Sequence, residues 1–308
     1  MKIFKNKTIL ITGGTGSLGQ QLTKRLLQSK VKKIIIYSRD EFKQYNMARE
    51  IPEERIRFFI GDVRDSLRLR RALEGVDYVV HAAALKHVPI CEYNPIEAIQ
   101  TNVLGAVNVI NQCLDQGVKK VVALSTDKGV NPVNLYGASK LCSDKIFISG
   151  NAYSGKRGTR FSVVRYGNVA ESRGSVIPLF KKLKAEGLIE LPVTSEKMTR
   201  FHITLDQGID LIIKAFNEMQ GGEIFVAKIP SYRIKDIVNH LGCKSNIIGV
   251  RPGEKLHEIM ITREDSNNTY DCGDHYLIIN PDYARPRGRK VMLGFEYRSD
   301  NNIKWVFN

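Results

Sequence analysis

Short runs of β-branched and apolar residues alternate with segments of helical periodicity through the first half of this chain. A buried parallel strand is a nearly continuous apolar run, whereas a helix that covers a sheet repeats its apolar residues every three to four positions. The runs that predict strands are 8–12, 33–38, 57–60, 78–81, 121–125 and 162–165. The segments that predict helices between them include 20–28, 96–115 and 138–148. This order predicts an α/β fold, with a doubly wound parallel sheet of the Rossmann type.

The regular alternation ends near residue 170. Helical patterns at 205–218 and 234–241 are then mixed with short strands and with turns that contain proline and glycine. The chain has 308 residues, 43% of them hydrophobic, which is enough for one large domain with a smaller lobe. We therefore predict a Rossmann domain over residues 1–170 and a smaller mixed α/β lobe over 171–308, which can return elements to the first domain.

Charge and composition exclude several classes of protein. The formal net charge is +15, but Lys and Arg are spread along the chain with short clusters only at 68–71 and 285–290, so we expect no nucleic-acid partner. Binding of anionic small molecules in a positively charged cleft is another explanation of the net charge. No segment approaches the ~18 apolar residues of a membrane span, and the first apolar run is too short for a signal peptide. Five scattered cysteines indicate reduced thiols, with no metal site, in a cytoplasmic protein.

A glycine-rich turn follows the first predicted strand. Three glycines recur at intervals of three residues, one residue different from the dinucleotide fingerprint, and an amphipathic helix comes next. Such a turn brings the backbone close to a pyrophosphate at a helix N-terminus. A plain strand-to-helix turn is the alternative. The residues expected to surround a dinucleotide here are Gly13, Thr15, Gly16, Ser17, Leu18 and Gly19.

The end of the second strand bears on the choice between NAD and NADP. An acidic residue there binds the free ribose hydroxyls of NAD, whereas an arginine accepts the 2′-phosphate of NADP. Ser38 and Arg39 occupy this position and Lys43 lies one helical turn further on, so we expect NADP. NAD is the alternative, because either Asp40 or Glu41 can be the acidic residue that binds the ribose hydroxyls.

Asp62 and Val63 follow the third strand, where they can hold the adenine edge of the cofactor. A helix N-cap is the alternative for Asp62.

Tyr136 and Lys140 stand four residues apart in a helical segment and so share one helix face. Ser125 and Thr126 end the preceding strand. A lysine beside a tyrosine lowers the phenol pKa, so that the tyrosinate can take a hydroxyl proton while hydride leaves for a nicotinamide. The spacing is common by chance, but its place after a glycine-rich turn and a Ser-Thr strand end favours catalysis.

Together these motifs resemble the inverting UDP-N-acetylglucosamine 4,6-dehydratases that open pseudaminic acid biosynthesis, which are extended short-chain dehydrogenases/reductases. The resemblance covers nearly the whole chain. It rests on the segments 37–41 (YSRDE), 82–89 (AAALKHVP), 125–128 (STDK), 134–137 (NLYG), 164–169 (VRYGNV) and 251–258 (RPGEKLHE). It implies an NADP-dependent lyase, a homo-oligomer, that makes a 4-keto-6-deoxy sugar nucleotide of L-arabino configuration, in a pathway such as flagellin glycosylation.

The same resemblance gives roles to Asp127 and Lys128, where retaining dehydratases carry Asp-Glu. It implies that Asp127 protonates the departing 6-hydroxyl and that Lys128 takes the proton from carbon 5. Lys128 can do this only if it is partly neutral, which we expect burial, Lys140 and the nicotinamide to promote. A 4-epimerase would need neither residue, and a silent NADP-binding regulator would need no catalytic group. The expected catalytic residues are Thr126, Asp127, Lys128, Tyr136 and Lys140.

The resemblance further implies that the second lobe holds the UDP part of the substrate. Charged and amide side chains there can meet phosphate, ribose and uracil edges, with ordinary loop hydrogen bonds as the alternative. The expected substrate-binding residues are Lys86, Asn168, Arg173, Thr194, Arg251 and Glu254. The resemblance also adds Ala82, Ala83 and Ala84, with Tyr136 and Lys140, to the cofactor contacts.

Overall fold

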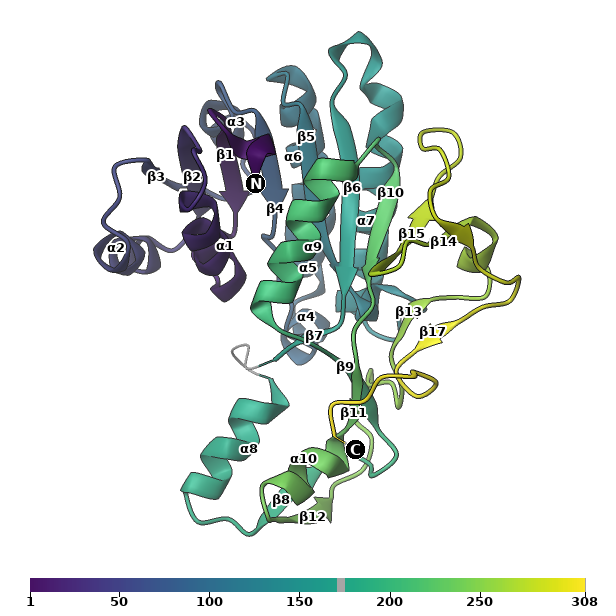
Figure 1. The fold of residues 1–308 in the computed structure, drawn as a ribbon. Coiled ribbons are helices and arrows are strands. Elements are labelled where there is room, and N and C mark those ends of the chain that lie inside the picture. Colours follow the sequence, from purple (N-terminus) through teal and green to yellow (C-terminus); the bar gives the residue numbers. More distant parts are fainter. Residues whose placement is uncertain (171–174, 308) are drawn as a thin grey trace.

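A large sheet dominates the computed structural model, which describes residues 1–170 and 175–307 (Figure 1). Its strand order is β16-β14-β15-β10-β6-β5-β4-β1-β2-β3. The strands are β1 (Thr8–Thr12), β2 (Lys33–Ser38), β3 (Ile56–Ile60), β4 (Tyr78–His81), β5 (Lys120–Thr126), β6 (Arg160–Tyr166), β10 (Glu223–Ala227), β14 (Thr269–Asp271), β15 (His275–Ile279) and β16 (Arg289–Lys290). The six strands predicted from the sequence are all present, within two residues of their expected ends.

Strands β1 to β6 and β10 pair in parallel, and β15, β14 and β16 extend the sheet antiparallel. The order β3-β2-β1-β4-β5-β6 is that of the Rossmann fold, so the predicted fold class is confirmed. The strand order reverses between β1 and β4. A ligand of such a sheet binds at the carboxyl ends of the strands beside this point.

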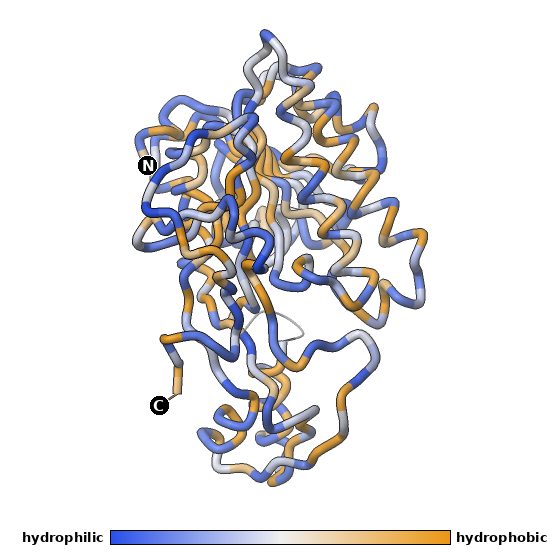
Figure 2. Tube along the Cα trace, turned by 90° about the vertical axis from the view of Figure 1, so that its right-hand side faces the viewer, coloured by the Kyte–Doolittle hydropathy of each residue, from blue (hydrophilic) through white to orange (hydrophobic). Residues whose placement is uncertain are grey.

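Helices cover both faces of the sheet, as the alternating pattern predicts (Figure 1). They are α1 (Ser17–Leu27), α2 (Glu41–Glu50) and α9 (Leu205–Glu218) on one face, and α3 (Ser66–Ala72), α6 (Gly105–Asp115) and α7 (Leu135–Ser149) on the other. Each face buries its own apolar cluster. Figure 2 shows hydrophobic segments along both the strands and the helices of this region. The helix expected over 96–115 is divided into α5 (Pro95–Ile99), a π-helical segment (Gln100–Leu104) and α6, with α4 (Val88–Tyr93) before them.

A smaller lobe lies below the carboxyl ends of the strands in Figure 1. It contains α8 (Val176–Ala185), β8 (Glu190–Val193), α10 (Ile234–His240) and β12 (Lys244–Ile247), packed around a third apolar cluster. Three short strands, β7 (Asn168–Val169), β9 (Thr199–Ile203) and β11 (Ser231–Arg233), form a sheet between the lobe and the large sheet. A further pair is β13 (Ile259–Ile261) with β17 (Tyr297–Arg298). Residues after 170 therefore build this lobe and also supply β10, β14, β15 and β16.

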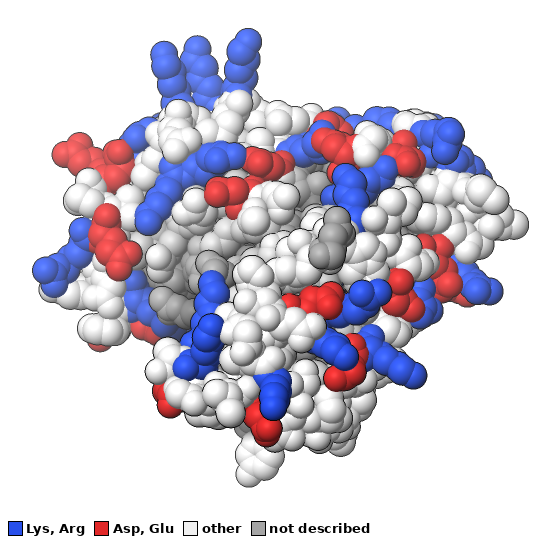
Figure 3. Space-filling view, turned by 60° about the horizontal axis from the view of Figure 1, so that its bottom comes forward, with Lys and Arg blue, Asp and Glu red and all other residues white. Residues whose placement is uncertain are grey.

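The surface has charges of both signs. On the face drawn in Figure 3, Lys and Arg are interspersed with Asp and Glu. Within residues 1–170 and 175–307, no helix combines the length and apolarity needed to cross a membrane. All five cysteines have free thiols.

Candidate active site

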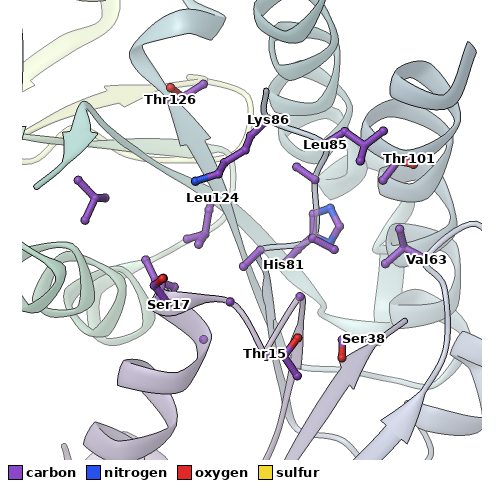
Figure 4. A pocket seen from close by; sticks show the side chains of 18 of the residues that line it. Thr15, Ser17, Ser38, Val63, His81, Leu85, Lys86, Thr101, Leu124 and Thr126 are labelled. Carbon is purple, nitrogen blue, oxygen red and sulfur yellow. The ribbon is translucent and has the colours of Figure 1, made fainter. Parts of the chain in front are cut away.

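A cavity of about 650 Å³ opens at the carboxyl ends of the parallel strands, where the strand order reverses. Figure 4 shows Thr15 and Ser17 reaching it from the glycine-rich turn, and Lys86 and Thr126 from the opposite side. The predicted site residues that line it are Gly13, Thr15, Gly16, Ser17, Leu18, Gly19, Ser38, Arg39, Lys43, Asp62, Val63, Ala82, Ala83, Ala84, Lys86, Thr126, Lys128, Tyr136, Lys140 and Asn168. The fold thus brings the expected cofactor set and most of the catalytic set to one surface.

The glycine-rich turn is held close to the loop that follows β4. Gly13 has φ +68°, and a Cβ atom there would lie 2.9 Å from the backbone nitrogen of Ala83, so only glycine fits. The hydroxyl oxygen of Thr12 accepts hydrogen bonds of 3.2 Å from the backbone nitrogens of Ala82 and Ala83. Helix α1 begins at Ser17 without a side-chain cap, so its first N–H groups stay free at the cavity. This cradle fits the pyrophosphate of a dinucleotide.

The cavity wall at the end of β2 carries two cations. Arg39 and Lys43 both line it, and their side chains are half exposed. Asp40 caps helix α2 by accepting a hydrogen bond of 2.9 Å from the backbone nitrogen of Lys43, and its carboxylate lies 2.7 Å from Nζ of Lys43. Asp40 also lines the cavity, paired with Lys43, whereas Glu41 does not line it.

Asp62 does not cap the following helix; Asp65 does, through the backbone nitrogen of Arg68. The carboxylate of Asp62 is held instead by Arg64, at 2.7 Å, and faces Arg39 at 3.7 Å.

Asn102, which the sequence reasoning missed, fixes the loop on the far side of the cavity. Its side chain accepts a hydrogen bond of 2.8 Å from the backbone nitrogen of Leu85 and donates one of 2.9 Å to the carbonyl of the same residue. It also donates to the hydroxyl of Ser139 on α7, at 2.9 Å. Asn102 lies in the π-helical segment and is buried, so the sequence pattern alone gave no signal for it.

Helix α7 presents the tyrosine and the lysine to the cavity. Asn134 caps the helix by accepting a hydrogen bond of 2.8 Å from the backbone nitrogen of Gly137. A Cβ atom at Gly137 would lie 2.2 Å from the carbonyl oxygen of Lys128, so this glycine allows the first turn of α7 to pack on the 127–129 turn. Tyr136 and Lys140 are both buried on one face of α7, and both line the cavity.

Without a bound cofactor, the pKa of Tyr136 is raised and not lowered. Burial raises the pKa of Tyr136 to about 12, and the opposing influences are the charge of Lys128 and a hydrogen bond with Thr126. Burial also lowers the pKa of Lys140, which weakens any help that its charge could give. Tyr136 is therefore a neutral phenol at pH 7 in this structure.

Asp127 and Lys128 form an ion pair at the end of β5. Nζ of Lys128 lies 3.2 Å from Oδ1 of Asp127 and donates a hydrogen bond of 3.0 Å to Oδ1 of Asn168. Asp127 is fully buried and does not line the cavity itself. Burial raises the pKa of its carboxyl group, against the lowering by Lys128.

Without a bound cofactor, Lys128 does not have the lowered pKa that was expected. Burial favours its neutral amine, but the carboxylates of Asp127 and Glu258 outweigh burial and raise the pKa above the ordinary lysine value. The sequence reasoning considered Lys140 and the nicotinamide and left out Glu258, which reaches the pair from the second lobe.

Three of the expected substrate residues do not line the cavity. Thr194 follows β8 in the smaller lobe, and Arg251 and Glu254 face each other at 3.8 Å. The 251–258 segment nevertheless contacts the catalytic helix, because Asn134 donates a hydrogen bond of 2.8 Å to the carbonyl of Gly253. Arg173 lies outside the described residues. The lining residues that were not predicted include His81, Leu85, Thr101, Leu124, Tyr166, Gly167, Val169, Ser175 and Leu205.

Comparison with known proteins places this geometry in context. The family model described as polysaccharide biosynthesis protein matches residues 9–280. A Campylobacter jejuni protein named UDP-N-acetylglucosamine 4,6-dehydratase (inverting) is 54% identical, over 99% of this chain and 96% of its own length. A Rickettsia canadensis protein named UDP-glucose 4-epimerase is 45% identical, over 97% of this chain and 92% of its own.

Solved structures share the fold. The X-ray structure of Pen from Bacillus thuringiensis superposes with a TM-score of 0.91 at 39% identity, covering 98% of this chain and 95% of that one. DesIV, a dTDP-glucose 4,6-dehydratase from Streptomyces venezuelae with NAD and TYD bound, gives a TM-score of 0.72 at 25% identity, covering 81% and 86%. The fold and cavity are those of the extended short-chain dehydrogenases/reductases. The chain belongs to the polysaccharide biosynthesis protein family, and its resemblance to the inverting dehydratases is confirmed.

Proposed function

We propose that this protein is an NADP-dependent UDP-N-acetylglucosamine 4,6-dehydratase that inverts carbon 5, giving UDP-2-acetamido-2,6-dideoxy-β-L-arabino-hex-4-ulose. The observation that carries the proposal is the presence of two pairs: Tyr136 with Lys140, which both line the cavity, and Lys128, which also lines it, with the buried Asp127 at 3.2 Å. The first pair suits oxidation of a hydroxyl, and the second supplies the acid and the base that an elimination needs. The name of the 54% identical relative agrees with this chemistry.

The residues that would hold NADP are those of the glycine-rich turn, with Arg39 and Lys43 toward the 2′-phosphate. Two cations at the end of β2, where the carboxylate of Asp40 is paired with Lys43, favour NADP over NAD. When bound, the cofactor accepts a hydride from carbon 4 and returns it to carbon 6, so no net redox change results.

Tyr136, once its own phenol proton has passed to solvent, would take the proton of the 4-hydroxyl as carbon 4 is oxidised. Because burial raises its pKa to about 12, this transfer depends on nearby positive charge and on the hydroxyl of Thr126. Lys140, one helical turn away, supplies charge on the same face. Lys86 and Asn168 line the cavity toward the smaller lobe, where the sugar nucleotide would lie, with Thr194, Arg251, Glu254 and Arg173 as more distant candidates for contacts.

The contact of 3.2 Å between Asp127 and Lys128 explains how a charged lysine can become a base. Transfer of one proton from the ammonium to the carboxylate gives a neutral acid and a neutral amine together. The amine then takes the proton from carbon 5, while Asp127 gives its proton to the 6-hydroxyl, which leaves as water. The pair thereby returns to its charged form, and protons balance over the elimination.

A UDP-sugar 4-epimerase is the second candidate, because a relative with 45% identity is named UDP-glucose 4-epimerase. The test is to incubate the purified protein with UDP-N-acetylglucosamine and NADP and to record the mass and proton spectrum of the product. A dehydratase removes one water, and the coupling constants of the product distinguish L-arabino from the configuration of a retaining enzyme. A product of unchanged mass with an inverted carbon 4 would show an epimerase and overturn the proposal.

We also propose that the chain forms homo-oligomers. Large apolar side chains of α4 and α5 are exposed, namely Ile90 at 54%, Tyr93 at 87% and Ile96 at 64%. Neighbouring exposed apolar residues of this size commonly mark contacts between proteins. Sedimentation of the wild type against a Tyr93→Lys variant tests this, and a monomeric wild type would refute it. The cytoplasmic location and the role in pseudaminic acid supply stay predictions.

A further inference from the structure

Glu258 brings a buried carboxylate from the second lobe to the catalytic turn. It is 2% exposed. Its Oε1 atom lies 3.6 Å from Nζ of Lys128 and 3.7 Å from Nε of Arg200, and its Oε2 atom lies 3.6 Å from Nζ of Lys255. Oε2 has no hydrogen-bond partner among the described residues. One carboxylate therefore faces three cations.

Distant segments fix this carboxylate in place. The backbone nitrogen of Glu258 donates a hydrogen bond of 2.9 Å to the hydroxyl of Ser299, whose own backbone nitrogen donates one of 2.9 Å to the carbonyl of Glu258. The hydroxyls of Ser299 and Thr199 share a hydrogen bond of 2.6 Å. Arg200 donates to the carbonyls of Thr199 and Leu256, at 2.7 and 3.2 Å. Position and orientation are thus set by β9 and the C-terminal segment.

Lys255 connects the same carboxylate to the backbone of the catalytic turn. Its Nζ atom donates hydrogen bonds to the carbonyl oxygens of Val130, at 2.5 Å, and of Asp127, at 3.5 Å. The side chain is largely buried, at 11% exposure. Glu258 therefore interacts with the 127–130 turn in two ways. Its charge lies beside Lys128, and it also faces Lys255, which is hydrogen-bonded to the backbone of the turn.

Without Glu258, the cations around Lys128 would outnumber the carboxylates by a wider margin. The groups that face Lys128 or its partners are the carboxylates of Asp127 and Glu258, the cations Arg200, Lys255 and Lys86, the phenols of Tyr136 and Tyr232 and the amide of Asn168. A buried charge is costly unless it is paired. Loss of Glu258 would leave Asp127 as the only carboxylate in this buried group.

We propose that Glu258 is a positioning residue that sets where protons reside in the Asp127–Lys128 pair. This rests on the proposed function of that pair. A negative charge beside both groups attracts protons to both, so that Lys128 regains its proton readily and Asp127 can exist as an acid. Replacement of Glu258 by a neutral isostere should lower the pKa of both Asp127 and Lys128. Glu258 contacts Lys128 and does not line the cavity, so it is not a catalytic residue.

The direct test measures Lys128 in the substrate-free protein, where no reaction is needed. Protein labelled with ¹³C at lysine Cε is titrated by NMR, and the Lys128 signal is identified by its loss in a Lys128→Gln variant. In Glu258→Gln the apparent pKa of Lys128 should fall by about 1–3 units, the range that an opposite charge at this separation produces. Glu258→Asp, which keeps the charge, should give a smaller fall and serves if the Gln variant does not fold.

Glu223→Gln is the matched control. Glu223 is equally buried and accepts hydrogen bonds from Ser162, Gln220 and Gly221, but it lies away from the catalytic turn. It should lower stability without changing the Lys128 titration. An unchanged Lys128 pKa in folded Glu258→Gln would overturn the proposal.

A second measurement separates this proposal from the proposed function. The pH profile of dehydration by Glu258→Gln should shift to lower pH on both limbs, and a simple loss of rate with an unshifted profile would contradict the positioning role. If the wild type makes no dehydrated product, the proposed function fails, while the NMR titration still decides the coupling of Glu258 to Lys128.

Discussion

The ammonium of Lys128 and the carboxylate of Asp127 are 3.2 Å apart although the two residues are neighbours in sequence. Adjacent side chains in a strand point to opposite faces, so this contact requires the 3-10 turn Asp127–Gly129 that follows β5. Thr126 supports the turn by accepting a hydrogen bond of 3.4 Å from the backbone nitrogen of Lys128. Asp127 and Lys128 are therefore one coupled unit, and a change at either residue alters both.

Replacement of Tyr136 by Phe should remove the proton acceptor for carbon 4 while the ring still packs. Turnover should fall by ~10²–10⁴, the range for a general acid–base group. Steady-state assays of product formation measure this, with Tyr153→Phe as the control because that tyrosine is exposed at 73%. Near-normal turnover of the Tyr136 variant would remove it from the mechanism.

Arg39→Ala should weaken the binding of NADP far more than the binding of NAD, since only NADP offers a 2′-phosphate to the guanidinium. The expected selective loss is about 1.5–3 kcal/mol, as for a hydrogen bond to a charged group. Calorimetric titration of both cofactors measures it. Arg49→Ala on the helix that follows, α2, is the control, because Arg49 does not line the cavity. Equal losses for NAD and NADP would mean that the preference for NADP has been misassigned.

Much of the parallel sheet could be predicted from the sequence because its central strands are buried on both faces. Strands of that kind stand out as apolar runs, and β1 is buried at all five positions. The ends of the sheet were harder. Strands β14 and β16 are short, are paired over few residues and lie beyond residue 260, so nothing in their local pattern shows that they join the first domain.

His81 should make stability depend on pH. Burial lowers its pKa from 6.5 to about 3, with a smaller contribution from the charge of Lys140. The unfolded chain therefore binds a proton below about pH 6.5 that the folded protein refuses until about pH 3, so stability is complete above pH 6.5 and falls as the pH falls.

Between pH 7 and 5 this residue should cost about 2 kcal/mol of the free energy of unfolding. Urea unfolding at both pH values measures the loss, and His81→Gln should lack this component. The glutamine can keep a hydrogen bond to Thr12, which lies 2.9 Å from the imidazole. Equal pH dependence of the two proteins would show that His81 is not the group responsible.

The cofactor side of the cavity follows from sequence more directly than the catalytic side. Its glycines lie close together in one short motif, and its other residues directly follow strands that the sequence predicts. Their position at the cavity therefore follows from the predicted fold. The state of Lys128 is not local, because Glu258 is 130 positions away along the chain and reaches it through β9 and the C-terminal segment. Its position in the 251–258 segment was visible in the sequence, but its partner was not.

The measurement that tests the central claim most directly is exchange at carbon 5 by a Lys128→Ala variant in deuterated water, with the mass of the product recorded alongside. The wild type should release one water and acquire deuterium at carbon 5. The variant retains Tyr136 and Lys140, so the absorbance of reduced cofactor should still rise on mixing with UDP-N-acetylglucosamine, with little exchange and little product. Lys145→Ala, an exposed position of α7, should behave as the wild type. Near-normal dehydration by Lys128→Ala would contradict the account.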